Sequence, residues 1–212
     1  MLTRVTELFD SAGWVAWPLL AMSVVSLALC IERLVFFIGL RRELSSSRVA
    51  AAVRAARASR SSAAGPTAPG VLGEFVRSMH GAASGVSVGE AAVLAGAAAV
   101  RPRLFRFLPT LSTVITAAPM LGILGTVTGI IESFGLLGSA EAVRDTTAMA
   151  AGISEALYTT AFGLTIALVV LFPYNAFRGS ADRALEIIET VGAAAIEAEA
   201  ASQPASPSAS NS

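Results

Sequence analysis

The sequence is poor in charged side chains and in the residues that most often do chemistry. Only 14% of its 212 residues are charged, whereas a soluble domain carries roughly 25%, which argues against a solvated globular enzyme and against a disordered polar chain. Cys30 is the only cysteine, which excludes an internal disulfide, and His80 is the only histidine, which excludes a metal site built from several histidines. Acidic and basic residues number 15 each, so no overall field favours nucleic acid.

The same scarcity bears on catalysis. With one histidine and one cysteine, neither a Ser/His/Asp nor a Cys/His set is available, and no glycine-rich phosphate loop follows a strand. We therefore expect a protein that is not an enzyme and that holds no metal and no cofactor.

What the sequence has in excess is apolar residues, gathered in three uncharged runs at 14–31, 107–131 and 156–177. About 20 apolar residues in a helix cross the ~30 Å hydrocarbon layer of a membrane, and no fourth run reaches that length. The first run is not expected to be a cleavable signal, because no basic region precedes it and Glu32 and Arg33 follow it. The sequence predicts an all-α integral membrane protein with three transmembrane helices and long helices that extend into the cytoplasm.

The arginines predict the orientation of these helices, because cytoplasmic loops are rich in basic residues. Ten arginines lie between Arg33 and the second span, whereas the connection between the second and third spans holds only Arg144. The long connection and the carboxyl end are therefore expected in the cytoplasm, and the amino terminus outside. The predicted organisation is an external segment at 1–12, transmembrane helices at 13–40, 107–137 and 148–177, a cytoplasmic helical connection at 41–106, an external loop at 138–147, a cytoplasmic helix at 178–200 and a disordered tail at 201–212.

Small residues recur at intervals of three and four along the second and third spans. Lipid does not drive helices together, so such stripes indicate where two backbones pack closely. Threonines beyond what packing needs leave open a second interpretation, a narrow wet pathway. The stripes are Gly122, Gly125, Thr126, Gly129 and Ser133 on one helix, and Gly152, Ala156, Thr160, Gly163 and Ala167 on the other; the hydroxyls are those of Thr126, Thr128, Thr159, Thr160 and Thr165.

Glu155 is the one charged residue in the 32 residues of 146–177. A carboxylate in the membrane costs on the order of 2.5–3.5 kcal/mol unless it faces water or a partner. It is therefore either a capping or interfacial residue or a titratable group on an ion path. Glu132, towards the outer end of the second span, is interpreted as an interfacial residue.

Two segments of these spans resemble a known family. Residues 111–134 (LSTVITAAPMLGILGTVTGIIESF) and 152–177 (GISEALYTTAFGLTIALVVLFPYNAF) resemble the MotA/TolQ/ExbB proton channel family. The likeness is greatest to the ExbB/TolQ branch, to which residues 31–33 (IER) are also similar. The resemblance implies a proton-channel subunit of a motor complex in the bacterial inner membrane, which couples the proton gradient to work on an envelope-spanning partner such as TonB or TolA. It further implies a homopentameric ring around a single-span ExbD- or TolR-like partner that supplies an aspartate.

The resemblance also assigns residues. It implies that Glu155, Thr160 and Thr126 line the proton path. Glu155 and Thr160 are five residues apart, about 140° around an ideal helix, so one of them is expected at a seam between subunits. Close helix packing is assigned to Gly122, Gly125, Gly129 and Gly163.

The third span departs from the family at one position. The family commonly has a proline where Val169 stands, whereas here Pro173 immediately precedes Tyr174, so a bend is expected elsewhere in the inner half of this span. An alternative function remains, a non-conducting membrane scaffold that assembles partner proteins. The process that a motor of this kind drives is not readable from the chain.

Overall fold

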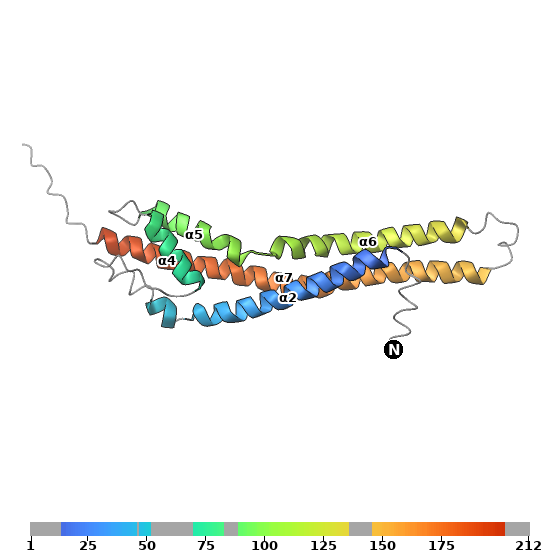
Figure 1. Cartoon of the computed structure of the whole chain (residues 1–212), viewed down its shortest axis with the longest axis horizontal. Coiled ribbons are helices and arrows are strands. Elements are labelled where there is room, and N and C mark those ends of the chain that lie inside the picture. The colour runs from blue at the N-terminus through green and yellow to red at the C-terminus, as the bar shows by residue number, and fades with distance from the viewer. Residues whose placement is uncertain (1–13, 46, 52–69, 83–88, 136–145, 202–212) are drawn as a thin grey trace, which may run out of the picture. The chain divides into compact units, whose positions relative to one another are not determined.

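The computed structural model describes residues 14–45, 47–51, 70–82, 89–135 and 146–201. These residues are helical apart from short turns, and no strand occurs among them. The five longer helices are α2 (Ala16–Glu43), α4 (Val71–Ala82), α5 (Glu90–Leu104), α6 (Leu108–Gly135) and α7 (Thr146–Ala200) (Figure 1). By length and composition α2, α6 and the part of α7 at Met149–Glu197 can each cross a membrane. The predicted all-α class with three spans is confirmed.

The chain divides into two compact units. The membrane unit comprises Met1–Leu34 and Phe107–Phe177, and the second unit comprises Val35–Arg106 and Arg178–Ser212. The predicted tail at 201–212 and external loop at 138–147 lie almost wholly outside the described residues.

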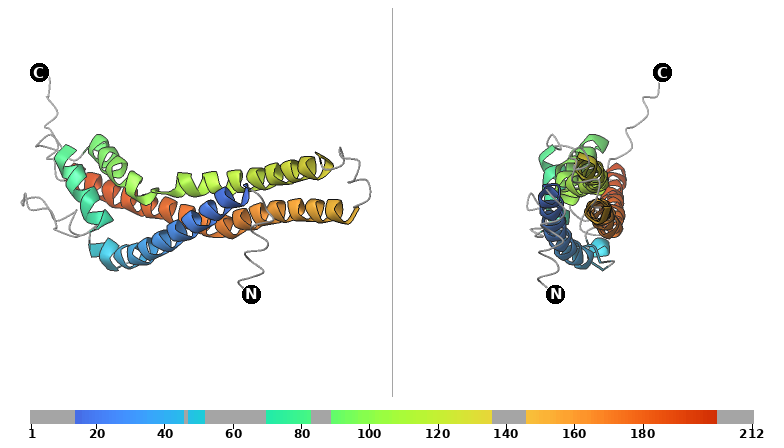
Figure 2. Two further views of the ribbon diagram at one scale, coloured as in Figure 1. Left: turned by 45° about the vertical axis from the view of Figure 1, so that its right-hand side comes forward. Right: turned by 90° about the vertical axis from the view of Figure 1, so that its right-hand side faces the viewer.

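In the membrane unit α6 and α7 run side by side in opposite directions, which Figures 1 and 2 show from three sides. The beginning of α2 and the residue before it pack against α6 and α7. Val15 and Leu19 meet Ala118 of α6, and Ile166 of α7 packs against the same cluster. Large apolar side chains on the rest of α2, such as Val24 and Leu27, are exposed on this single chain. Such a surface suits lipid or another apolar helix rather than water.

Arg33 has an unusual position for a charged residue, because its side chain is only 2% exposed. Its Nε and Nη2 donate to the Glu32 carboxylate at 2.6 and 3.0 Å, and its guanidinium lies 5.4 Å from the centre of the Phe107 ring. A buried charge requires such partners, because without them its desolvation costs on the order of several kcal/mol. The apolar run of α2 therefore ends on a neutralised arginine held inside the fold.

Phe107 itself has a φ of 64°, in the left-handed region that side chains other than glycine rarely adopt. Its carbonyl accepts the bond from Leu111 N, at 3.0 Å, that opens α6. The Arg33 guanidinium therefore contacts the residue whose backbone sets the start of this span.

The second unit has a core of large apolar side chains. Phe75 and Met79 of α4 are buried, as are Val100 of α5 and Ile188 of α7. Alanine-rich α5 approaches α4 closely, because a Cβ at Gly96 would lie 2.9 Å from the Phe75 ring. Two polar contacts connect helices of this unit. Leu72 N donates a hydrogen bond to Glu43 Oε1 at 2.9 Å, and Arg103 Nη1 donates one to Glu74 Oε2 at 3.1 Å. The assignment of this unit to the cytoplasm stays a prediction.

Candidate functional site

The interface between α6 and α7 is made by small residues in facing positions. A Cβ at Gly122 would lie 2.9 Å from Thr160 Cα, and a Cβ at Gly129 would lie 2.7 Å from Ala156 Cβ. Any side chain at these glycines would therefore push the two helices apart. The stripes read from the sequence meet here, together with Ala118 and Thr159, which were not among their members. The facing pairs are Ala118–Gly163, Gly122–Thr160, Gly125–Thr159, Gly129–Ala156 and Ser133–Gly152.

Thr126 and Thr160 come together across this interface. Their hydroxyls form a hydrogen bond in which either oxygen can donate. The Thr160 hydroxyl also reaches the Gly122 carbonyl at 2.9 Å, and the Thr126 hydroxyl reaches the carbonyls of Ala156 at 3.1 Å and Gly122 at 3.2 Å. Two of the three residues assigned to the proton path by resemblance thus form one hydrogen-bonded pair between facing helices.

Thr159 joins the same group of atoms. The sequence counted it among the threonines of a possible wet pathway but did not assign it to the proton path. Its side chain is 2% exposed, and its hydroxyl reaches the carbonyls of Ala156 at 2.7 Å and Gly122 at 3.2 Å. The signal was present, because Thr159 follows Gly152 by seven residues and precedes Gly163 by four, and helical spacing puts all three on one face. Several threonines lie in these spans, and composition alone does not indicate which of them is buried at the interface.

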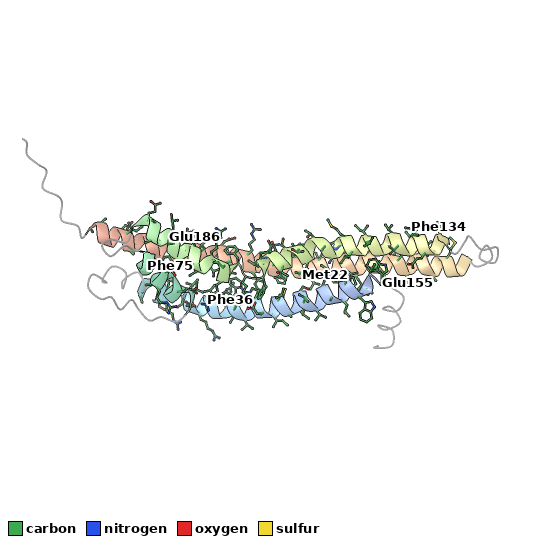
Figure 3. All side chains as sticks on the ribbon, turned by 45° about the horizontal axis from the view of Figure 1, so that its top comes forward. Met22, Phe36, Phe75, Phe134, Glu155 and Glu186 are labelled. Carbon is green, nitrogen blue, oxygen red and sulfur yellow. The ribbon has the colours of Figure 1, made fainter. Side chains whose placement is uncertain are left out.

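Glu155 lies beside this group and does not enter it. Its side chain is half-buried, and it forms no hydrogen bond or ion pair with another described residue. Figure 3 shows Glu155 on α7 between the level of Met22 and that of Phe134 at the end of α6. By the rise per residue, Glu155 lies about 6 Å along α7 from Thr159 and about 7.5 Å from Thr160. The four-residue spacing puts Glu155 on the same side of the helix as Thr159, whereas Thr160 is about 140° around the axis from it.

The position of Glu155 in α7 excludes a capping role, and it leaves an interfacial position and an ion path as interpretations of this residue. The helix begins at Thr146, nine residues earlier, which is about 14 Å along the axis. A residue so far inside a helix cannot cap its amino end. The remaining explanations are contact with water, with a partner, or with another subunit.

The geometry of α6 and α7 falls in the region that a known family model matches. Residues 82–190, just over half of the chain, match the model of the MotA/TolQ/ExbB proton channel family. The chain belongs to this family. The matched region contains Thr126, Glu155, Thr159 and Thr160, whereas Arg33 precedes it.

Individual members of the MotA/TolQ/ExbB family give the same result. A Synechocystis protein named as ExbB-like biopolymer transport protein 3 is 32% identical over 196 residues, which cover 84% of this chain and 87% of the relative. TolQ, a Tol-Pal system protein of Pseudomonas aeruginosa, is 43% identical over 70 residues, 33% of this chain and 30% of the relative. The biopolymer transport protein ExbB of Pseudomonas putida is 42% identical over 71 residues, 33% and 21% of the two chains. The expected ExbB/TolQ branch is confirmed.

Membership of the MotA/TolQ/ExbB family supplies the general function. The chain is a membrane protein of a proton-channel and transport family, and its three apolar helices fit an inner membrane. The described residues contain no group of three or more His, Cys, Asp and Glu side chains that could hold a metal ion.

Proposed function

We propose that the chain is the proton-conducting subunit of an ExbB/TolQ-type motor complex, in which Glu155, Thr160 and Thr126 line the proton path. The observation that carries the proposal is the hydroxyl pair of Thr126 and Thr160, held between two helices whose backbones touch at Gly122. A hydroxyl both donates and accepts, so a continuous chain of hydrogen bonds can cross the interface through this pair. Close packing alone does not require it.

Glu155 supplies the titratable group in this proposal. A charged carboxylate is energetically unfavourable in lipid, and this favours an arrangement in which the carboxylate of Glu155 meets water or a partner. It is about 140° from Thr160 around the helix, so the two do not touch within one chain. We propose that a carboxylate from a single-span ExbD- or TolR-like partner, or water, bridges them in the complex.

The proposed complex follows the resemblance to ExbB and TolQ. It contains a homopentamer of this chain, the single-span partner and an envelope-spanning protein of the TonB or TolA kind. The exposed apolar side chains of α6 and α7, such as Ile123, Val127 and Phe162, support contacts with lipid or further apolar helices. The arginine distribution supports an external amino terminus and a cytoplasmic carboxyl end in the inner membrane of a bacterium.

The test replaces the proposed path residues in cells and measures gradient-dependent work of the complex. Glu155→Ala and Thr160→Val should abolish that work and leave assembly unchanged, because they remove proton-exchanging groups without adding bulk; loss of a positioned acid or base lowers a rate by about 10² or more. Glu90→Ala is the matched control, because Glu90 is an exposed acid on α5.

A non-conducting scaffold gives a different result. In that case work at the wild-type rate would persist in both path variants, as long as the complex assembles. Wild-type rates with Glu155→Ala would remove the central residue from the proposed function.

A further inference from the structure

The cluster of threonine hydroxyls at the α6–α7 interface has three hydroxyl donors and only two carbonyl acceptors. The donors are the hydroxyls of Thr126, Thr159 and Thr160, and the acceptors are the carbonyls of Gly122 and Ala156. Each carbonyl lies within a helix, where it already accepts a backbone N–H, and has two lone pairs in all. Each carbonyl therefore has room for one hydroxyl, and the three threonines compete for them.

The distances show how this competition is arranged. Thr159 is nearest to the Ala156 carbonyl, at 2.7 Å, whereas Thr126 is 3.1 Å from the same oxygen. Thr160 is nearest to the Gly122 carbonyl, at 2.9 Å, whereas Thr126 and Thr159 are each 3.2 Å from it. The two shortest bonds thus belong to the two α7 threonines, and Thr126 is left with Thr160 as its acceptor.

We infer that Thr159 is a positioning residue for the proton path: by occupying the Ala156 carbonyl it directs the Thr126 hydroxyl towards Thr160. The pair then has one direction, from Thr126 to Thr160 to the Gly122 carbonyl. In this arrangement the lone pairs of Thr126 Oγ1 stay open to a proton donor in the path. This inference rests on the proposed function of the pair.

Removing the Thr159 hydroxyl frees the Ala156 carbonyl. Thr126 then donates to Ala156 or to Thr160, and the pair loses its single direction. The free-energy difference between the two arrangements changes by that of one hydrogen bond. The fraction of pairs in which Thr126 donates to Thr160 therefore falls by about threefold to tenfold. Packing is not expected to change with valine, because valine has nearly the shape of threonine.

The experiment measures proton flux of the whole complex, purified with its partner from native membranes and placed in liposomes of phosphatidylethanolamine and phosphatidylglycerol. Thr159→Val should lower the flux by about threefold to tenfold with unchanged assembly, and should change the ratio of fluxes in H2O and D2O. Thr159→Ser, which keeps the hydroxyl and loses the methyl group, should restore both. The matched control is Thr190→Val, because Thr190 makes the same kind of bond within α7, to Glu186 O at 2.9 Å, from an exposed position.

The outcomes separate this inference from the function on which it rests. If Thr159→Val behaves as Thr190→Val does, or if Thr159→Ser loses as much flux as Thr159→Val, the positioning role of the hydroxyl is wrong. Glu155→Gln and Thr160→Val are measured in the same preparation. Wild-type flux in those two variants overturns the proposed function, whereas their loss beside a normal Thr159→Val overturns only the role of Thr159.

Discussion

Each of the two units of this protein is stabilised internally by a different kind of contact. The second unit buries large side chains such as Phe75, Met79 and Ile188, whereas the interface of α6 and α7 in the membrane unit is made of glycines and alanine with threonine hydroxyls between them. In water, burial of apolar area stabilises a core by roughly 25 cal/mol per Å². Lipid provides no such driving force, so helices there associate through close backbone contact and hydrogen bonds.

The difference has a consequence for function. A core of large apolar side chains has no room for polar atoms, whereas contacts between glycine backbones leave hydroxyls and carbonyls facing one another. The α6–α7 interface can therefore serve for packing and for hydrogen-bond transfer at once.

The largest effect is expected where the second unit has its bulkiest buried residue. Phe75→Ala removes a fully buried ring that contacts Gly96 and Gly192, and should cost about 3–5 kcal/mol of stability. Thermal unfolding of the purified protein in detergent measures this, with Leu94→Ala as a control, because Leu94 is exposed on α5. Equal midpoints for the two variants would contradict a core of this kind.

A smaller but still large effect is expected in the membrane unit on adding a methyl group. Gly122→Ala places a Cβ 2.9 Å from the Thr159 carbonyl oxygen, and backbone cannot move aside as a side chain can, so we expect a loss of about 1–3 kcal/mol. Gly39→Ala is the control, because a Cβ there meets no atom within 4 Å. The same unfolding assay compares them, and a Gly122→Ala protein as stable as Gly39→Ala would show that the helices do not touch at Gly122.

The smallest effect concerns the start of α6. Phe107→Ala and Phe107→Gly both remove the ring that stacks on Arg33, but glycine adopts a φ of 64° without strain. The glycine variant should therefore be the more stable of the two, by about 1 kcal/mol. Midpoints of chemical unfolding compare the pair directly; a more stable alanine variant would mean that Phe107 is not held in the left-handed region.

The sequence was enough to find the spans, because an uncharged run reports helix length directly. It also placed Thr126 and Thr160 on the small-residue stripes, whose period marks one face of each helix. It did not show that Thr159 belongs to the same buried group, since composition does not rank one threonine above another. Nor did it show where α7 begins, and so how far Glu155 lies inside the helix.

Other features depend on contacts between distant parts of the chain. The packing of Val15 and Leu19 against the middle of α6 leaves no trace in hydropathy, because lipid-facing and helix-facing apolar residues have the same composition. The stacking of Arg33 on Phe107 likewise joins residues that no periodic pattern connects.

The most direct test of the account is whether the hydroxyls of Thr126 and Thr160 work as one pair. Proton flux is measured for the complex in liposomes with Thr126→Val, with Thr160→Val and with both. Residues that act as a unit are non-additive, so the account predicts that the double variant conducts no worse than the poorer single variant. Flux at the wild-type rate in the single variants, or losses that multiply in the double variant, would contradict it.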